Sequence, residues 1–187
     1  MNDDLEDVLS KESIVLGAGC FWGTEAVFKM LKGIISVKPG YAGGAREDLT
    51  YEEISSGSAG HAEVVKIKYC PKKISLDSLL AVFFSIHNPT HQSENIGGKY
   101  RSIILCTSLE QKKNVRKFIE KLIDSGQQGS PIITEVRSLD VFHTAESNHI
   151  NYFENHSEQA YCQTVIGPKL KKVQKEFPKL LQKKLNG

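Results

Sequence analysis

Hydrophobic residues along the chain occur in two patterns: short continuous runs, and positions three or four residues apart. The run at residues 14–16 ends in glycines, which predicts a buried strand closed by a turn. Between Trp22 and Gly33 the apolar positions follow helical spacing. By the same criteria, further strands are predicted at 34–37, 61–69, 102–106 and 132–136, and further helices at 76–87, 108–126, 145–156 and 168–185.

The order of the first six predicted elements is strand, helix, strand, strand, helix, strand. This is the order of the split βαβ, ferredoxin-like arrangement. We therefore predict an α+β fold with a ferredoxin-like split βαβ core, a mostly antiparallel sheet packed with helices, long loops and extra C-terminal helices. The glycine-rich segment 39–60 has little periodicity, so it is interpreted as a long irregular loop.

Composition and charge are those of an ordinary globular protein. The chain has 187 residues, 40% hydrophobic and 25% charged, with a net charge of +2, so one domain over residues 1–187 is expected. Residues 1–12 are acidic and lack the features of a signal peptide, so they are interpreted as a flexible or helical extension. No apolar stretch is long enough to cross a bilayer, and the C-terminal lysines have the spacing of a solvated helix face. We expect a cytoplasmic monomer that binds neither nucleic acid nor membrane.

The cysteines give the first indication of chemistry. Cys20, Cys70, Cys106 and Cys162 occur in a chain without an export signal, where cysteines are more often catalytic, redox-active or packed than disulfide-bonded. Cys20 stands at the predicted start of a helix, where free N–H groups and the helix dipole favour a thiolate. The aromatic residues at positions 21 and 22 then form an apolar wall for a substrate; alternatively, all three residues belong to the core.

Glu63 and two tyrosines are the other candidates. Strand alternation places Glu63 on the face that carries Val65 and Ile67, where desolvation raises the pKa of a carboxyl and lets it act as a general acid. The alternative is a position at the exposed rim of the strand. Tyr51 and Tyr100 are phenolic donors that could bind a polar oxygen. The six histidines show no metal-ligand spacing, so no metal site is expected.

Several motifs in this order resemble those of peptide methionine sulfoxide reductase of the A type, which acts on the S epimer of the sulfoxide. The resemblance covers roughly residues 13–177. It is carried by Gly-Cys-Phe-Trp-Gly-Thr-Glu at 19–25, Gly-Tyr-Ala-Gly-Gly at 40–44, Thr-Tyr at 50–51, Ser-Gly at 56–57, Gly-His-Ala-Glu-Val at 60–64, Tyr-Arg-Ser at 100–102 and Ala-Glu at 145–146.

The resemblance implies a role for each matching residue. Cys20 takes the position of the nucleophile and Glu63 that of the general acid. Tyr51 and Tyr100 match the hydroxyls that bind the sulfoxide oxygen. Cys162 lies where many members have their resolving cysteine, which converts a Cys20 sulfenic acid into a Cys20–Cys162 disulfide. Thioredoxin, or a dithiol such as DTT in vitro, would then restore the thiols, and no bound cofactor is needed.

The substrate-binding positions are also implied by the resemblance. Phe21 and Trp22 match the residues that hold the substrate methyl group, and Gly19 permits close approach of the substrate. Asn95 stands where Asp is usual, which removes a charge from the pocket. The expected substrates are oxidised proteins and peptides, with the free amino acid sulfoxide as a further candidate.

Two other classes of function remain open on the sequence alone. A cysteine-dependent hydrolase would use Cys20 with His61 as the base and Glu63 to orient it. A non-catalytic module would bind peptides through Phe21 and Trp22.

Overall fold

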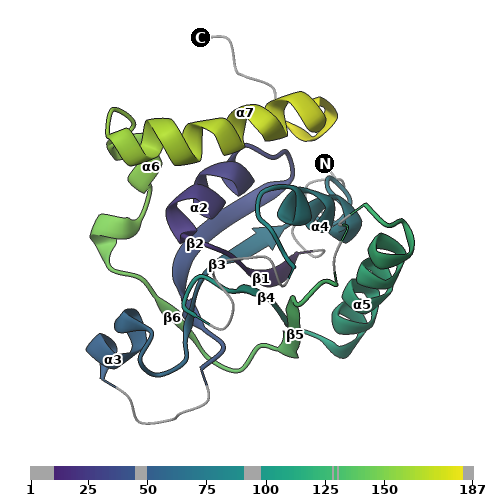
Figure 1. Cartoon of the computed structure of the whole chain (residues 1–187), viewed down its shortest axis with the longest axis horizontal. Coiled ribbons are helices and arrows are strands. Elements are labelled where there is room, and N and C mark those ends of the chain that lie inside the picture. Colours follow the sequence, from purple (N-terminus) through teal and green to yellow (C-terminus); the bar gives the residue numbers. More distant parts are fainter. Residues whose placement is uncertain (1–10, 45–49, 91–97, 128, 130, 183–187) are drawn as a thin grey trace, which may run out of the picture.

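A six-stranded, strongly curled sheet forms the centre of the fold (Figure 1). The computed structural model describes residues 11–44, 50–90, 98–127, 129 and 131–182, and the helices and strands named here lie within these ranges. The strands are β1 (Glu12–Ala18), β2 (Ile34–Ala42), β3 (Ala62–Tyr69), β4 (Ser102–Cys106), β5 (Glu135–Ser138) and β6 (Phe142–Thr144). Their order in the sheet is β5-β4-β1-β3-β2-β6, in which β4 and β5 pair in parallel and all other neighbours are antiparallel.

Helices of very different length cover and connect these strands. The α-helices are α2 (Phe21–Lys29), α3 (Tyr51–Ser56), α4 (Leu76–Ser85), α5 (Leu109–Asp124), α6 (Tyr152–Asn155) and α7 (Gly167–Glu176). Short 3₁₀ helices occupy Ser147–His149 and Pro178–Leu180, and a π-helix occupies Cys162–Ile166. None of the helices within the described residues is long and apolar enough to cross a membrane.

The sequence signals for helix starts correspond to real caps. The Ser108 side chain accepts the backbone N–H of Gln111 at the start of α5, and Ser75 accepts that of Ser78 at the start of α4. Such caps satisfy N–H groups that have no partner within the helix, and each contributes about 1 kcal/mol.

The main core lies between one face of the sheet and helices α2 and α4. Phe28 from α2 and Phe83 from α4 are fully buried there together with Ile14 and Ile67 from the strands. Burial of each such side chain contributes about 1.5–3 kcal/mol. Side chains of the opposite face, such as Val15, form a smaller cluster with Leu139 from the segment between β5 and β6. Because β1 is buried on both faces, its carboxyl end is a rigid support for the residues that follow.

The α+β class and the mostly antiparallel sheet are confirmed. The ferredoxin-like arrangement of the core remains a prediction. The segment 39–60 is less irregular than expected, because β2 extends to Ala42 and α3 forms at its end. The extension is stabilised by pairing with β3 on one side and β6 on the other. Gly40 permits the second contact, since a Cβ there would lie 2.3 Å from the carbonyl oxygen of His143.

The predicted helix at 145–156 is wrong. Asn151 has a φ of 57°, in the left-handed region, and this separates a 3₁₀ turn from the short helix α6. The conformation is fixed by Glu25, whose carboxylate oxygens accept the N–H of Asn151 at 3.1 and 3.0 Å. This tertiary contact from α2 thus overrides a local helical pattern. The final helix is also shorter than predicted, because α7 ends at Glu176 and Pro178 follows its C-cap residue Phe177.

Candidate active site

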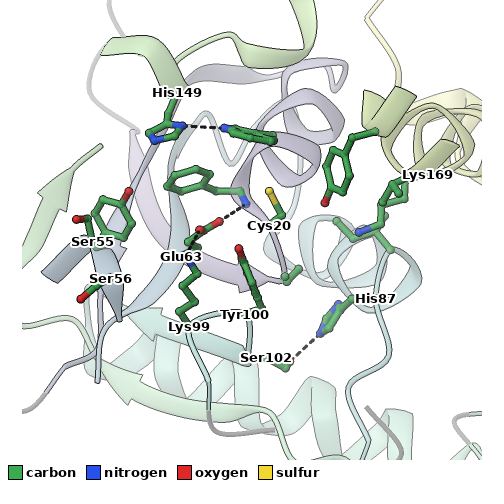
Figure 2. A pocket seen from close by; sticks show the side chains of 18 of the residues that line it. Cys20, Ser55, Ser56, Glu63, His87, Lys99, Tyr100, Ser102, His149 and Lys169 are labelled. Atoms are coloured by element: carbon green, nitrogen blue, oxygen red, sulfur yellow. Dashed lines mark hydrogen bonds and ion pairs between the residues drawn. The ribbon is translucent and has the colours of Figure 1, made fainter. Parts of the chain in front are cut away.

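A cavity of about 940 Å³ opens where β1 ends and α2 begins (Figure 2). Its wall combines apolar rings, carboxylates, hydroxyls and two lysines around one thiol. Its lining includes Gly19, Cys20, Phe21, Trp22, Tyr41, Glu63, His87, Lys99, Tyr100, Glu146, His149, Tyr161 and Lys169.

Cys20 is the residue immediately before α2, with extended backbone angles of φ −57° and ψ 127°. Its sulfur has hydrogen bonds with the backbone N–H of Trp22 and the hydroxyl of Tyr161, and both favour the thiolate. Burial and the carboxylate of Glu63 act more strongly in the opposite direction and raise the pKa of Cys20 to about 11. The helix start alone therefore does not make Cys20 a thiolate, because desolvation and a neighbouring negative charge outweigh it.

Glu63 lies beside Cys20 and is only 6% exposed. Its Oε2 accepts the backbone N–H of Phe21 at 3.1 Å, and its Oε1 lies 3.6 Å from Nζ of Lys99. Burial raises the pKa of Glu63, although the Phe21 N–H and the Lys99 charge oppose the shift. Of the two positions considered from the sequence, the buried one is therefore observed. A carboxyl held in this way can donate a proton within the cavity.

The two aromatic residues after Cys20 form one wall of the cavity. Phe21 is 2% exposed and packs against the Tyr41 ring with 5.5 Å between centroids. Trp22 stacks on Tyr152 at 3.6 Å, and its Nε1 donates to Nδ1 of His149 at 3.1 Å. These contacts fix both rings, so the wall is preformed.

Tyr41, Tyr51 and Tyr100 differ in how they lie relative to this wall. Tyr100 and Tyr41 line the cavity, whereas Tyr51 is 42% exposed and is not among the lining residues. Both Tyr41 and Tyr51 have hydrogen bonds to Glu146, the first at 3.2 Å. Burial and Glu146 raise the pKa of Tyr51 to about 12, so its hydroxyl keeps its proton. The structure thus brings Tyr100 to Cys20 and Glu63, with Tyr51 outside them.

Cys162 does not line the cavity. It is fully buried at the start of the π-helix, and both it and Cys20 are free thiols in this structure. The residue before it, Tyr161, lines the cavity. Its ring lies edge-on to the Trp22 ring, with 5.9 Å between the ring centroids. Tyr161 therefore connects the segment of Cys162 with Cys20.

Several lining residues were missed by the sequence analysis. Tyr161 could have been suspected from its place beside Cys162, and Glu146 from its motif. Lys99 directly precedes Tyr100, but nothing in the local pattern indicates a role for its charge, and Lys169 comes to the cavity from α7. Asn95 lies outside the described residues. Among those residues, no group of three His, Cys, Asp or Glu side chains is arranged to hold a metal ion.

Arg101, 8% exposed, joins the loops around the cavity. Its guanidinium donates to the Glu135 carboxylate at 2.8 Å and to the carbonyl oxygens of Gly98, Gly43 and Gly60 at 3.3, 3.1 and 3.0 Å. These carbonyls belong to the segments that lead to Tyr100, follow β2 and precede β3. One side chain thus fixes the relative positions of the segments that carry the cavity residues.

Arg101→Lys is expected to lower the free energy of unfolding by about 1–3 kcal/mol. The single ammonium of lysine cannot replace the several N–H donors of the guanidinium, so buried carbonyl oxygens lose their hydrogen bonds. Urea unfolding measures this change. Arg137→Lys is the matched control, since Arg137 also donates to Gly43 but is 45% exposed. An Arg101→Lys variant as stable as this control would contradict the joining role of Arg101.

The fold and the cavity together define a thiol-dependent enzyme. A cysteine at a helix start, a buried carboxyl beside it and a preformed apolar wall are the parts that such chemistry requires.

Comparison with known proteins identifies the family. Residues 12–181 match the family model described as peptide methionine sulfoxide reductase. A similar protein is the peptide methionine sulfoxide reductase MsrA of Sulfolobus acidocaldarius, 46% identical over 89% of this chain and 96% of that protein. Among solved structures, Mxr1 from Saccharomyces cerevisiae in reduced form has a TM-score of 0.72 at 29% identity, covering 85% of this chain and 93% of the other. Mxr1 in complex with Trx2 has a TM-score of 0.56 at 28% identity, covering 78% and 87%.

The chain belongs to the peptide methionine sulfoxide reductase family. It is an oxidoreductase that reduces methionine sulfoxide by means of a thiol.

Proposed function

We propose that Cys20 is the nucleophile of this reduction. The observation that carries the proposal is the position of Cys20 at the start of α2, inside the cavity and beside the buried carboxyl of Glu63. The Cys20 thiolate attacks the sulfoxide sulfur, the oxygen takes up a proton, and methionine leaves while Cys20 becomes a sulfenic acid. The preformed wall of Phe21 and Trp22 holds the methyl group, and Gly19 leaves room for the approach.

Glu63 supplies the proton in this proposal. Its raised pKa and its place beside Cys20 suit a general acid that acts on the oxygen as negative charge develops there. Tyr100, which lines the cavity, is the hydroxyl that binds that oxygen in this proposal. Tyr51 contributes through its bond to Glu146, or reaches the oxygen after a rotation of its exposed side chain.

Cys162 completes the cycle. Its thiol condenses with the Cys20 sulfenic acid, which forms a disulfide and releases water. A dithiol protein of the thioredoxin type then reduces this disulfide by exchange, and the yeast relative in complex with Trx2 supports that choice of partner. Because Cys162 is buried beside Tyr161, this step requires the π-helix to rearrange.

The wider setting of the activity follows from these roles. We propose that the enzyme repairs oxidised proteins and peptides, that it acts on the S epimer of the sulfoxide, and that it needs no prosthetic group, because the thiols carry both electrons. A single domain over residues 1–187, a monomeric state and a cytoplasmic location are parts of the same proposal.

The hydrolase alternative has little support in the geometry. His61, its required base, is 4% exposed and is not among the cavity-lining residues. Its ring packs against that of His143 at 5.4 Å, and a Cβ on Gly44 would collide with it. The peptide-binding alternative lacks a use for the buried carboxyl beside the thiol.

Intact-mass analysis after one equivalent of a methyl sulfoxide substrate tests the cycle. The expected product has lost two hydrogen atoms, as a Cys20–Cys162 disulfide. A Cys162→Ser variant should instead gain one oxygen, located on Cys20 by peptide mapping. An unchanged mass, with the substrate bound but intact, would support the peptide-binding alternative and refute the proposal.

Glu63→Gln is expected to slow the first turnover by about 10²-fold, at the low end of what a general acid contributes. The amide can still hold the oxygen by donating a hydrogen bond, so activity should remain measurable by single-turnover kinetics. The same variant should react faster with iodoacetamide at pH 8, because removal of the carboxylate lowers the raised pKa of Cys20. Slower reaction with iodoacetamide would show that Glu63 is not the negative charge that restrains the thiol.

A further inference from the structure

Two lysines line the cavity on different sides of Cys20. Figure 2 shows Glu63 and Lys99 on one side of the cysteine and Lys169 on the other. Lys99 comes from the segment before β4, and Lys169 comes from the first turn of α7. Neither lysine belongs to the sequence motifs that indicate the reaction. The surroundings of each lysine indicate what its charge does.

Lys99 faces the acid. Its Nζ lies 3.6 Å from Oε1 of Glu63 and 5.0 Å from the centroid of the Tyr100 ring, and its side chain is 34% exposed. The charge of Lys99 lowers the pKa of Glu63 against the effect of burial. Lys99 therefore favours an ionised Glu63.

Lys169 faces the nucleophile. Its aliphatic stem crosses the first turn of α2 at Gly23, where a Cβ would lie 3.9 Å from Cδ of Lys169. Within the described residues no carboxylate lies within 4 Å of its ammonium. Burial lowers the pKa of Lys169, and Cys20 is the group that opposes this shift. A partly buried cation without a carboxylate partner is costly unless an anion appears beside it.

Cys20 and Glu63 can hold one proton between them in two ways. A neutral thiol with a carboxylate has the same total charge as a thiolate with a carboxylic acid. Only the second form is ready for reaction, because it has both a nucleophile and a proton donor. A cation close to Glu63 favours the first form, whereas a cation close to Cys20 favours the second.

We propose that Lys99 and Lys169 are positioning residues that act in opposite directions on the proton shared by Cys20 and Glu63. Lys169 stabilises the reactive form with the thiolate, and Lys99 stabilises the resting form with the thiol. The resting form protects Cys20 from indiscriminate oxidation, since the thiolate is the species that reacts. This inference rests on the proposed function of Cys20 and Glu63 and extends it.

The other titratable groups around the pair do not supply a comparable charge at Cys20. Burial lowers the pKa of His87 to about 4, so it is neutral. Burial raises the pKa of Tyr41 and of Tyr161, so both keep their protons. His149 acts on Glu63 rather than on Cys20, and it lies 3.6 Å from the Glu146 carboxylate.

The test compares Lys99→Met and Lys169→Met by the rate at which iodoacetamide modifies Cys20 between pH 6 and pH 10. Peptide mass mapping restricts the measurement to Cys20, and circular dichroism confirms folding. Lys169→Met should react about tenfold more slowly at pH 8, the change that one pKa unit produces. Lys99→Met should react faster at neutral pH. Lys171→Met, which removes an exposed charge from the same helix, should match the unmodified protein.

The decisive outcome is that the modification rate of Cys20 falls in Lys169→Met and rises in Lys99→Met. Mere loosening of the cavity would change the rate of both variants in the same direction. Lys169→Arg should restore the rate lost in Lys169→Met, since it restores the charge. Equal profiles for Lys169→Met and Lys171→Met, or a shared sign for Lys99→Met and Lys169→Met, would overturn the inference. Full sulfoxide turnover by Cys20→Ser would instead refute the proposed function, so the two failures are distinguishable.

Discussion

Cys20→Ser is expected to abolish methionine sulfoxide reduction, with a loss of at least about 10⁴-fold in the first turnover. The serine hydroxyl is a far weaker nucleophile than a thiolate at neutral pH, and it cannot accept the sulfoxide oxygen to become a sulfenic acid, as the thiolate does. The measurement is methionine formed per enzyme with DTT as the reductant, so that recycling does not limit the result.

The matched control is Cys106→Ser, because Cys106 is also buried but ends β4 and is not among the cavity-lining residues. It should keep its first-turnover rate if the protein folds, although it loses some stability. Full activity in Cys20→Ser would remove the basis of the mechanism, and an equal loss in both variants would indicate unfolding rather than chemistry.

Cys162→Ser is expected to complete one turnover at nearly the normal rate and then to stop when thioredoxin is the reductant. The variant still forms the sulfenic acid on Cys20, but it has no thiol to form the disulfide that exchange requires. Steady-state turnover with thioredoxin should fall by about 10²-fold or more, while one equivalent of methionine still appears per enzyme.

Cys70→Ser is the control for this second result, because Cys70 is another buried cysteine outside the cavity lining. It should recycle normally with thioredoxin. If Cys162→Ser also recycles at the full rate, either another cysteine resolves the sulfenic acid or thioredoxin reduces it directly. DTT should restore turnover to Cys162→Ser, since a small dithiol can reach Cys20 without the help of the protein.

The parts of the fold that local sequence determines were predicted well. The strands at 61–69 and 102–106 and the capped helix after Ser108 have apolar periodicity and side-chain caps that act within a few residues. The wrong predictions concern segments whose conformation is determined by contacts with residues far away in the sequence. The segment after Ala145 has a helical pattern, but Glu25 from α2 holds Asn151 in the left-handed region and ends the helix.

The residues of the candidate site differ in the same way in how far the sequence could predict them. Cys20 and Glu63, which both line the cavity, were candidates from the sequence because a strand-to-helix turn and strand alternation are readable from a few neighbouring residues. The pKa of Cys20 was misjudged, because the helix start is a local feature whereas burial and the charge of Glu63 are tertiary. Lys99 and Lys169 were missed for the same reason: a surface-type residue becomes a cavity residue only through packing of the segments around it.

Trp22 has a consequence for observation as well as for catalysis. It is the single tryptophan of the chain, and its indole lies in the cavity wall, stacked on Tyr152 and bonded to His149. All tryptophan emission from this protein therefore originates in the cavity wall, next to Cys20. We therefore expect the fluorescence of Trp22 to report changes in the cavity wall without any added label.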